Sequence, residues 1–406
     1  MPRMSIDAEG ERLAPRGLPG ATVLQIVPAL DDDHSGREVL DLTLALVRGG
    51  ARAIVASPEG TLVPELQSFG GEWIAYAGAS SRFWPMPRTS RHLLAELLAT
   101  ERIDIIHTRG VRAAKFAAKA IDPFATRLVF GCGGEALAHG RDRVFSRALL
   151  RADRVLAHSG YLADLLIEAH EVPRERAIVV PRRIDTARFD PSAVSIERIA
   201  ALRQAWNVQR GKRIILVPGA IDPANGQHVL IEAARMLVSG GLRHVVFVLA
   251  GDRSGQPAYA LALTTSARAH GVGHLVRQVG ICPDMPAAYA AADFVALPAI
   301  VPPTFGRAAA EALAMGRPVV ASELGALPEL VLAPPRAPQS ARTGWLVAPA
   351  DPVALARGLA AAEALELAAL SSVGAHARRL ATLLLSPGQV TAAVWAVYAG
   401  LIEQSA

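Results

Sequence analysis

Short runs of apolar residues alternate with longer amphipathic segments along almost all of the 406-residue chain. The apolar runs have the length of buried β-strands, and the segments between them have the period of α-helices. Strand–helix–strand units of this kind predict α/β domains whose parallel sheets are covered by helices on both faces. The expected strands are 21–30, 51–57, 104–110, 127–134, 151–159, 176–185, 213–220, 244–252, 275–280, 294–299 and 317–322.

The alternation stops at 186–194 (TARFDPSAV) and then begins again. Because one hydrophobic core rarely serves a chain of this length, we expect two domains. Their sheets would face each other across a cleft. The predicted parts are a flexible tail over 1–19, a Rossmann-like domain over 20–188, a second Rossmann-like domain over 189–386 and a final helix over 387–406.

Composition limits the class of function. The net charge is +5, nearly all from Arg, but no Lys/Arg run is interleaved with aromatic residues, so we expect no nucleic-acid partner. Between Arg82 and Arg154 there are 14 Arg/Lys and seven Asp/Glu. The segment 82–88 (RFWPMPR) in this region could touch an anionic membrane face or a phosphorylated acceptor, or be a solvated loop.

Cysteine use and hydropathy point to the cell interior. Two cysteines cannot build a disulfide framework or a zinc site, and a reducing compartment fits them. The first 19 residues lack the apolar core of a signal peptide, and no uninterrupted apolar run approaches 18 residues. We therefore expect a cytoplasmic protein, with peripheral contact at the inner face of the membrane as an option.

Candidate chemistry lies where strands end, because open parallel sheets bind ligands beyond the carboxyl ends of their strands. One strand ends at Gly219, and a helix begins near Gly226 whose free N–H groups could hold a diphosphate. A second helix begins at Gly306, with Arg307 in reach of a phosphate and Glu311 one turn further on. A carboxylate there can accept both hydroxyls of a ribose. Ordinary turns and a solvated glutamate are the alternative interpretation.

These segments, in this order, resemble glycosyltransferase family 4, nucleotide-sugar-dependent enzymes of the two-domain GT-B fold. The resemblance covers residues 21–400, and it implies that the first domain binds the acceptor, the second binds the donor, and the final helix returns to the first domain. It also implies retention of anomeric configuration and no metal cofactor. The runs that carry it include VLQIVPALD, DIIHTRG, RADRVLAHS, PRRIDTARFDP, GQHVLIEAA, VFVLAGD, DMPAAYAAADFVALPA, FGRAAAEALAMGRPVVAS and TGWLVAP.

The resemblance assigns roles to individual positions. It places Glu311 at the ribose of the donor, Phe305 and Gly306 in the turn that faces the donor sugar and phosphate, and Asp284, Met285 and Pro286 in the loop near the base. His107 and Arg109 would line the acceptor side. The chain also contains a Gly turn that ends in Glu329.

Five features depart from the family pattern. Ala220 stands where the family has Arg after Gly219, and Asn225 where it has Lys before Gly226. Pro303 stands where the first Glu of the donor motif is expected, Cys132 where the catalytic-side His is expected, and Asp33–His34 where a Gly-Gly loop is expected. Losing a charge-stabilising group costs about 10²–10³ in rate.

Two functions follow from the resemblance. The first is a metal-independent, retaining hexosyltransferase that moves a sugar from a nucleotide sugar to a saccharide or lipid-linked acceptor in cell-surface polysaccharide or glycoconjugate synthesis. Cys132, His107 and Arg109 would form its catalytic and acceptor side. The alternative is an inactive GT-B protein that binds a glycan or nucleotide or regulates a partner. An NAD-dependent enzyme fits poorly, since GCGGEA (131–136) lacks the last Gly of the dinucleotide fingerprint.

Overall fold

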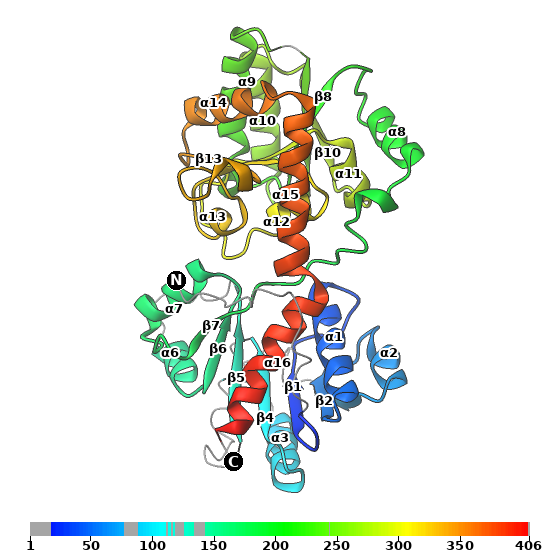
Figure 1. Ribbon diagram of the computed structural model, residues 1–406, viewed down its shortest axis with the longest axis vertical. Coiled ribbons are helices and arrows are strands. Elements are labelled where there is room, and N and C mark those ends of the chain that lie inside the picture. The colour runs from blue at the N-terminus through cyan, green and yellow to red at the C-terminus, as the bar shows by residue number, and fades with distance from the viewer. Residues whose placement is uncertain are drawn as a thin grey trace. The chain divides into compact units, whose positions relative to one another are not determined.

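The computed structural model describes residues 18–76, 88–110, 113–114, 117, 126–133, 143–242 and 244–404. They form two compact units, each built on a parallel sheet (Figure 1). The first unit comprises the chain up to Ala157, Leu165–Val180 and Gly388–Ala406, and the second comprises His158–Asp164 and Pro181–Pro387. Both sheets are parallel throughout, so the predicted fold class of two Rossmann-like domains is confirmed.

The sheet of the first unit has the order β3-β2-β1-β4-β5-β6-β7. Its strands are β1 (Thr22–Ile26), β2 (Arg52–Ser57), β3 (Glu72–Ala75), β4 (Ile105–Arg109), β5 (Arg127–Cys132), β6 (Arg154–Ala157) and β7 (Ala177–Val179). Its helices are α1 (His34–Arg48), α2 (Val63–Ser68), α3 (Arg88–Thr100), α6 (Arg143–Leu150) and α16 (Pro387–Glu403). Helix α7 (Gly160–His170) belongs to this unit from Leu165 onward, and its first residues belong to the second unit. The sequence pattern did not predict β3, whose side chains are all partly or fully exposed.

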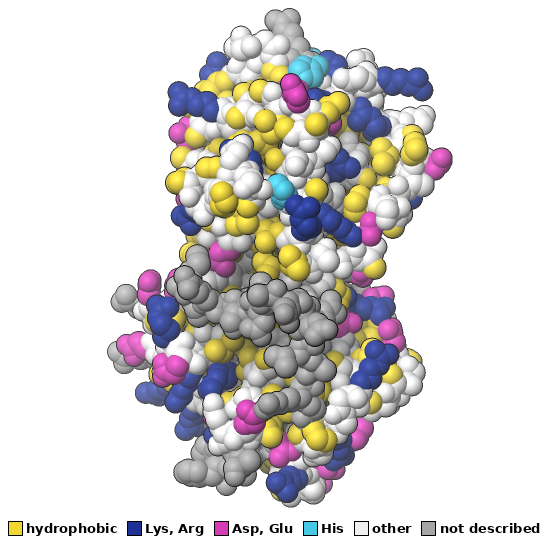
Figure 2. All heavy atoms as spheres, in the orientation of Figure 1, with side chains coloured by type: hydrophobic (Ala, Val, Ile, Leu, Met, Phe, Trp, Pro, Cys, Tyr) yellow, Lys and Arg dark blue, Asp and Glu magenta, His cyan; other side chains and the backbone are white. Residues whose placement is uncertain are grey.

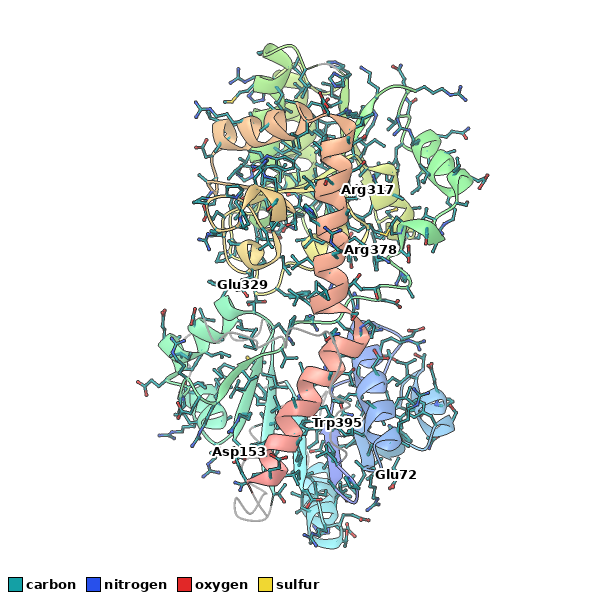
Figure 3. The ribbon with its side chains drawn as sticks, in the orientation of Figure 1. Glu72, Asp153, Arg317, Glu329, Arg378 and Trp395 are labelled. Atoms are coloured by element: carbon teal, nitrogen blue, oxygen red, sulfur yellow. The ribbon has the colours of Figure 1, made fainter. Side chains whose placement is uncertain are left out.

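Helix α16 covers one face of this sheet. Val390, Val394 and Trp395 pack in the core formed by residues of β1, β2, β4 and α1. Trp395 (labelled in Figure 3) lies so close to the end of α1 that a Cβ at Gly49 would stand 2.0 Å from its ring. Leu18 belongs to the same core and is 4% exposed, so the tail predicted over 1–19 ends before this residue.

The sheet of the second unit has the order β10-β9-β8-β11-β12-β13. Its strands are β8 (Arg213–Pro218), β9 (Val245–Ala250), β10 (Val276–Gly280), β11 (Phe294–Leu297), β12 (Val319–Ser322) and β13 (Gly344–Val347). Its helices are α8 (Ile196–Ala205), α9 (Gln227–Ser239), α10 (Pro257–Ala269), α11 (Met285–Ala291), α12 (Arg307–Ala314), α13 (Leu327–Leu330), α14 (Pro352–Glu363) and α15 (Leu367–Leu385).

Two cores sandwich this sheet because side chains alternate along each strand. In β8, Ile214 and Leu216 face the core that contains α11, α12 and α15. Ile215 and Val217 face the opposite core, which contains α9, α10 and α14. This double burial is the reason that the strands of the unit read as continuous apolar runs.

The predicted domain boundary at 188 differs from the observed one, because 181–188 belongs to the second unit. The Ile184 N–H donates to the Leu385 carbonyl at 2.7 Å, and the Arg378 side chain binds the carbonyls of Thr186 and Phe189. These long-range contacts hold the connecting segment on α15, and a local sequence pattern does not contain them.

Two further features bear on the membrane. Leu367–Glu403 is long and apolar enough to cross a bilayer by length and composition, with a mean hydropathy of 1.5. It consists of α15 and α16, with an extended residue at Ser386, and its inward residues pack in the cores described above.

The segment 82–88 lies outside the described residues except at its last position, where α3 begins. On the face shown in Figure 2, basic and acidic side chains are interspersed.

Candidate functional site

The loop after β8 brings together four of the predicted donor-binding residues. Gly219 and Gly226 both have positive φ, at 125° and 68°, which only glycine adopts readily. The Asn225 side-chain amide donates to the Ala220 carbonyl at 2.9 Å, and the Gln227 amide donates to the same carbonyl at 2.8 Å. The loop is therefore tightly folded ahead of α9, and its residues 219–226 include no Lys or Arg.

The turn before α12 contains the next group of predicted residues. Gly306 is the N-cap of α12 in the left-handed conformation, and Phe305 is 7% exposed in the core. The Pro303 carbonyl accepts the Ala326 N–H at 2.9 Å. A Cβ at Gly325 would stand 2.5 Å from that carbonyl oxygen, so the glycine turn allows the contact.

Arg307 is the first residue of α12, and its side chain is exposed. A cation at this position repels the positive end of the helix dipole, and it can attract an anion to the same place. Among the positions that the sequence assigned to the donor phosphates, it is the one that carries a positive charge.

Glu311 has a defined hydrogen-bond partner. The Tyr289 hydroxyl donates to Glu311 Oε2 at 3.0 Å, and Tyr289 itself is fully buried. Burial, together with the negative charge of Glu311, raises the pKa of Tyr289 well above its ordinary value, so the phenol stays protonated and keeps donating. Tyr289 was not predicted from the sequence; the available signal was a single large polar-tipped residue among the alanines of MPAAYAA.

Asp284 and Met285 open α11. The Asp284 carboxylate caps the helix by accepting the Ala287 N–H at 3.1 Å, and it pairs with both ends of the Arg198 guanidinium at 2.7 and 2.9 Å. Hydrogen bonding to Arg198 is the main cause that lowers the pKa of Asp284. Met285 packs against the core. Arg198, which comes from α8, was not predicted.

A cavity of about 780 Å³ lies at the carboxyl ends of β9 and β10. It combines an acid, a base and a hydroxyl from the loop after β9 with apolar residues of α10, and sequence reasoning missed all of them. Asp252 accepts the N–H and the hydroxyl of Ser254, both at 2.8 Å, which lowers the pKa of Asp252. The lining residues are Asp252, Arg253, Ser254, Pro257, Ala260, Leu261, Thr264, Gln278, Gly280 and Ile281.

The predicted acceptor side lies in the first unit, and two of its residues are engaged within the fold. His107 is 2% exposed, and its Nδ1 lies 2.6 Å from the Tyr398 hydroxyl of α16. His107 follows Ile105 by two positions in β4, so both side chains point to the face that α16 covers. Arg109 forms an ion pair with Glu38 at 2.8 Å. His107 is thus buried against α16, and its role on the acceptor side stays a prediction.

Cys132, at the end of β5, is fully buried, and its Sγ lies 3.7 Å from the Gly133 carbonyl oxygen. In the loop after β1, Asp33 caps α1 by accepting the Gly36 N–H at 2.8 Å, and Asp32 pairs with Arg37 at 2.7 Å. These aspartates therefore have structural partners in this loop.

Glu329 is also engaged. Within the second unit its two carboxylate oxygens accept the N–H groups of Gly160 and Tyr161, each at 2.7 Å (Glu329 is labelled in Figure 3). The neighbouring Ser159 hydroxyl donates to the Thr304 carbonyl at 2.6 Å. Glu329 thus caps a helix N-terminus. Among the described residues, no group of three or more His, Cys, Asp or Glu could hold a metal ion.

Comparisons with known proteins agree with this geometry. The family described as Glycosyltransferase Family 4 matches residues 35–188, and the family described as Glycosyl transferases group 1 matches residues 212–363. Together the two matches take in most of both units. The chain belongs to the GT-B glycosyltransferases of the family 4 type.

Curated relatives and solved structures are consistent with the family. The chain is 34% identical over 226 residues to the D-inositol 3-phosphate glycosyltransferase of Salinispora arenicola, and 32% identical over 216 residues to that of Streptomyces avermitilis. The matches cover 52% and 51% of this chain and 47% and 44% of those relatives, so the chain spans about half their length.

In fold, the chain is similar to a glycosyltransferase from Rickettsia africae, with a TM-score of 0.76, 21% identity and 95% and 99% coverage of the two chains. It is also similar to Anabaena Alr3699/HepE in complex with UDP, with a TM-score of 0.74, 21% identity and 94% and 100% coverage.

Proposed function

We propose that the protein is a retaining hexosyltransferase. The donor would be a nucleotide sugar bound by the second unit, and the acceptor a saccharide or a lipid-linked sugar in cell-surface polysaccharide or glycoconjugate synthesis. The observation that carries the proposal is the position of Glu311 on α12, one turn after the left-handed Gly306, with its carboxylate oriented by Tyr289.

Each part of the donor has candidate contacts in this unit. The Glu311 carboxylate would accept the ribose hydroxyls, and the N–H groups at the starts of α9 and α12 would face the diphosphate, where the helix dipoles favour negative charge. The cavity after β9 and β10 has the mixed apolar and polar lining that suits a base. The helix termini would carry most of the phosphate interaction, since Ala220 and Asn225 bring no charge.

We also propose that the reaction uses no metal cofactor and takes place in the cytoplasm, with peripheral membrane contact through 82–88. The family resemblance supports the first point. Turnover that is unchanged by a chelator is the expected result, and loss of turnover that Mg²⁺ or Mn²⁺ restores would contradict it.

Nucleotide binding by the purified protein tests the proposal directly. Calorimetry with UDP, GDP and ADP should give binding in the micromolar range for one of them. UDP-glucose is the first donor to try, because Anabaena Alr3699/HepE was crystallised with it. D-inositol 3-phosphate is the first acceptor to try, because the curated relatives carry it in their name. No heat with any nucleotide at millimolar concentration would contradict the proposal.

The second candidate is a GT-B protein that binds a nucleotide or glycan, or regulates a partner, without turnover. The observation that favours it is the loop after β8. There the Asn225 side-chain amide donates its hydrogen bond to the Ala220 carbonyl, and residues 219–226 include no cation that could neutralise a leaving diphosphate. Nucleotide binding without release of UDP from UDP-glucose, with or without acceptor, supports this candidate. An ordinary turnover rate in the wild type excludes it.

A further inference from the structure

Glu311 is held by a closed ring of contacts inside the second unit. The ring runs from Glu311 to Tyr289, from Tyr289 to Phe189, from Phe189 to Arg378, and from Arg378 back to Ala314 at the end of the helix that carries Glu311. We propose that Tyr289 and Arg378 are positioning residues that fix Glu311 for the ribose of the donor. This inference rests on the proposed function, and it adds Tyr289 and Arg378 to the residues that serve donor binding.

The first half of the ring acts on the carboxylate itself. The Tyr289 hydroxyl reaches Glu311 Oε2 at 3.0 Å and the Ala308 carbonyl of the same helix at 3.3 Å. The Tyr289 ring meets the Phe189 ring edge to face, with centroids 6.1 Å apart. Both rings lie in the core, at 0% and 3% exposure, so close packing fixes the position of the hydroxyl oxygen beside Glu311.

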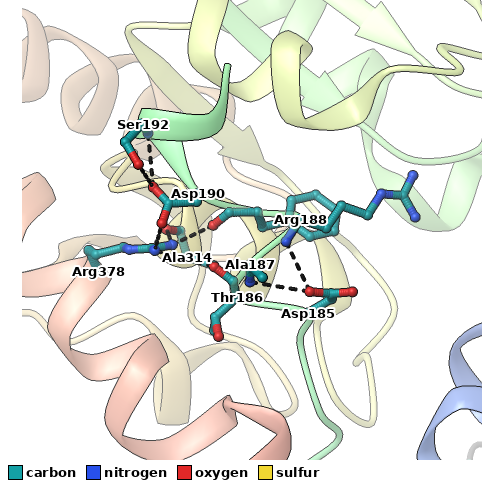
Figure 4. Close-up of polar contacts among 9 residues, drawn as sticks. Asp185, Thr186, Ala187, Arg188, Asp190, Ser192, Ala314 and Arg378 are labelled. Carbon is teal, nitrogen blue, oxygen red and sulfur yellow. Dashed lines mark hydrogen bonds and ion pairs between the residues drawn. The ribbon is translucent and has the colours of Figure 1, made fainter.

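The second half of the ring acts on the helix. Figure 4 shows the Arg378 guanidinium between the connecting segment and α12. It donates to the carbonyls of Phe189 and Ala314, the latter at 2.5 Å, and to Asp190 Oδ2 at 2.8 Å. A further contact reaches the Thr186 carbonyl at 3.3 Å. Ala314 is the last residue of α12, so a cation stands at the negative end of its dipole.

Helix α12 needs such an anchor. It has eight residues, and four of its five buried side chains are alanines, which interlock weakly with their neighbours. Just beyond its end, Gly316 packs closely on α15, the helix that carries Arg378, since a Cβ at Gly374 would stand 2.3 Å from the Gly316 carbonyl oxygen. A planar guanidinium can satisfy several carbonyls at fixed angles, and a lysine ammonium cannot reproduce that geometry. Loss of Arg378 therefore frees the helix that aims Glu311.

The ring predicts a specific pattern of variants. Tyr289→Phe and Arg378→Met should each raise the Kd for UDP about tenfold, and Arg378→Lys should restore little of the loss. With UDP-glucose as donor, KM should rise more than kcat falls, because Glu311 contacts the ribose and not the reacting bond. The double variant should lose less than the product of the single losses, since both changes break one ring.

Arg379→Met is the matched control, because Arg379 is the exposed neighbour on α15 and the change removes the same charge. Its Kd for UDP should match that of the wild type. If Arg379→Met weakens binding as much as Arg378→Met, net charge is the cause and the ring is contradicted.

A second measurement keeps this inference separate from the proposed function. Hydrogen exchange followed by mass spectrometry, without ligand, should show faster exchange in α12 for Tyr289→Phe and Arg378→Met, with β8 and β9 unchanged and Arg379→Met like the wild type. Unchanged α12 exchange in both variants overturns the ring, whether or not UDP binds. If α12 exchanges faster in the two variants but the wild type binds no nucleotide, the ring stands and the proposed function is removed.

Discussion

The Tyr398 hydroxyl lies 2.6 Å from Nδ1 of His107, although the two residues are 291 positions apart in the chain. The rings meet edge to face, with centroids 5.9 Å apart. Burial raises the pKa of Tyr398 well above its ordinary value, so this phenol is protonated at neutral pH. The contact joins α16 to β4 inside the first unit, and it gives a histidine expected at an acceptor surface a structural partner.

Tyr398→Phe should therefore destabilise the first unit. The change leaves a buried imidazole nitrogen without its hydrogen bond, which costs about 1–3 kcal/mol. Denaturant unfolding followed by circular dichroism measures the change. Tyr161→Phe is the control, because no hydroxyl contact of Tyr161 is found among the described residues. Equal stability of Tyr398→Phe and wild type would show that the contact contributes nothing.

Gly226→Ala should destabilise the second unit and weaken UDP binding. Gly226 has φ 68°, and an added Cβ would stand 1.9 Å from the Pro298 carbonyl oxygen. The strained backbone alone costs about 1–3 kcal/mol, and the backbone clash adds to it. Gly240→Ala at the other end of α9 is the control, because its added Cβ makes only ordinary contacts, at 3.4 and 3.5 Å. Thermal unfolding that shifts equally in both variants would contradict the prediction.

The Arg198–Asp284 pair should stabilise the fold in a pH-dependent way. Arg198 lowers the pKa of Asp284 below its ordinary value of 3.8, so the pair stabilises the folded state above that value. The contribution is lost as the pH falls through the lowered pKa. Arg198→Gln should therefore have a slightly lower Tm than wild type near neutral pH. The two should converge in acid, and a difference that persists or grows there would contradict the assignment.

Restoring the missing charges should raise activity. Ala220→Arg, Asn225→Lys and Pro303→Glu together supply the groups that the resemblance implies at these positions, and we expect UDP-glucose turnover to rise by about 10² or more. The substitutions keep the local hydrogen bonds. The Gln227 amide still donates to the carbonyl of residue 220, and the carbonyl of residue 303 still accepts the Ala326 N–H, because both acceptors are backbone atoms.

The matched control for this restoration adds two cations and an acid on the exposed face of α15, as Ser371→Arg, Ser372→Lys and Ala375→Glu. Release of UDP from UDP-glucose is the measurement. No gain over this control would mean that the three positions do not face the donor.

The sequence predicted the parallel sheets and the family correctly because both depend on local patterns. Runs such as IILVP (214–218) and VVFVLA (245–250) are apolar at every position because they are buried on both faces, and motif order along the chain carries the family. It also located Glu311 and the glycine turn at Gly306, because spacing within one helix is local. The donor and acceptor roles of these residues stay predictions.

Only the tertiary structure decided what each side chain touches. His107 hydrogen-bonds Tyr398, and Glu311 accepts a hydrogen bond from Tyr289. Arg378 donates hydrogen bonds to carbonyls that lie 64 to 192 positions away in the chain. No local pattern encodes such partners, because they come from packing elements whose order in the sheet differs from their order in the chain. The sequence by itself determined the scaffold, and the departures from the family pattern at Ala220, Asn225 and Pro303 stay a prediction from the resemblance. The tertiary structure decided how the remaining carboxylate, Glu311, is held.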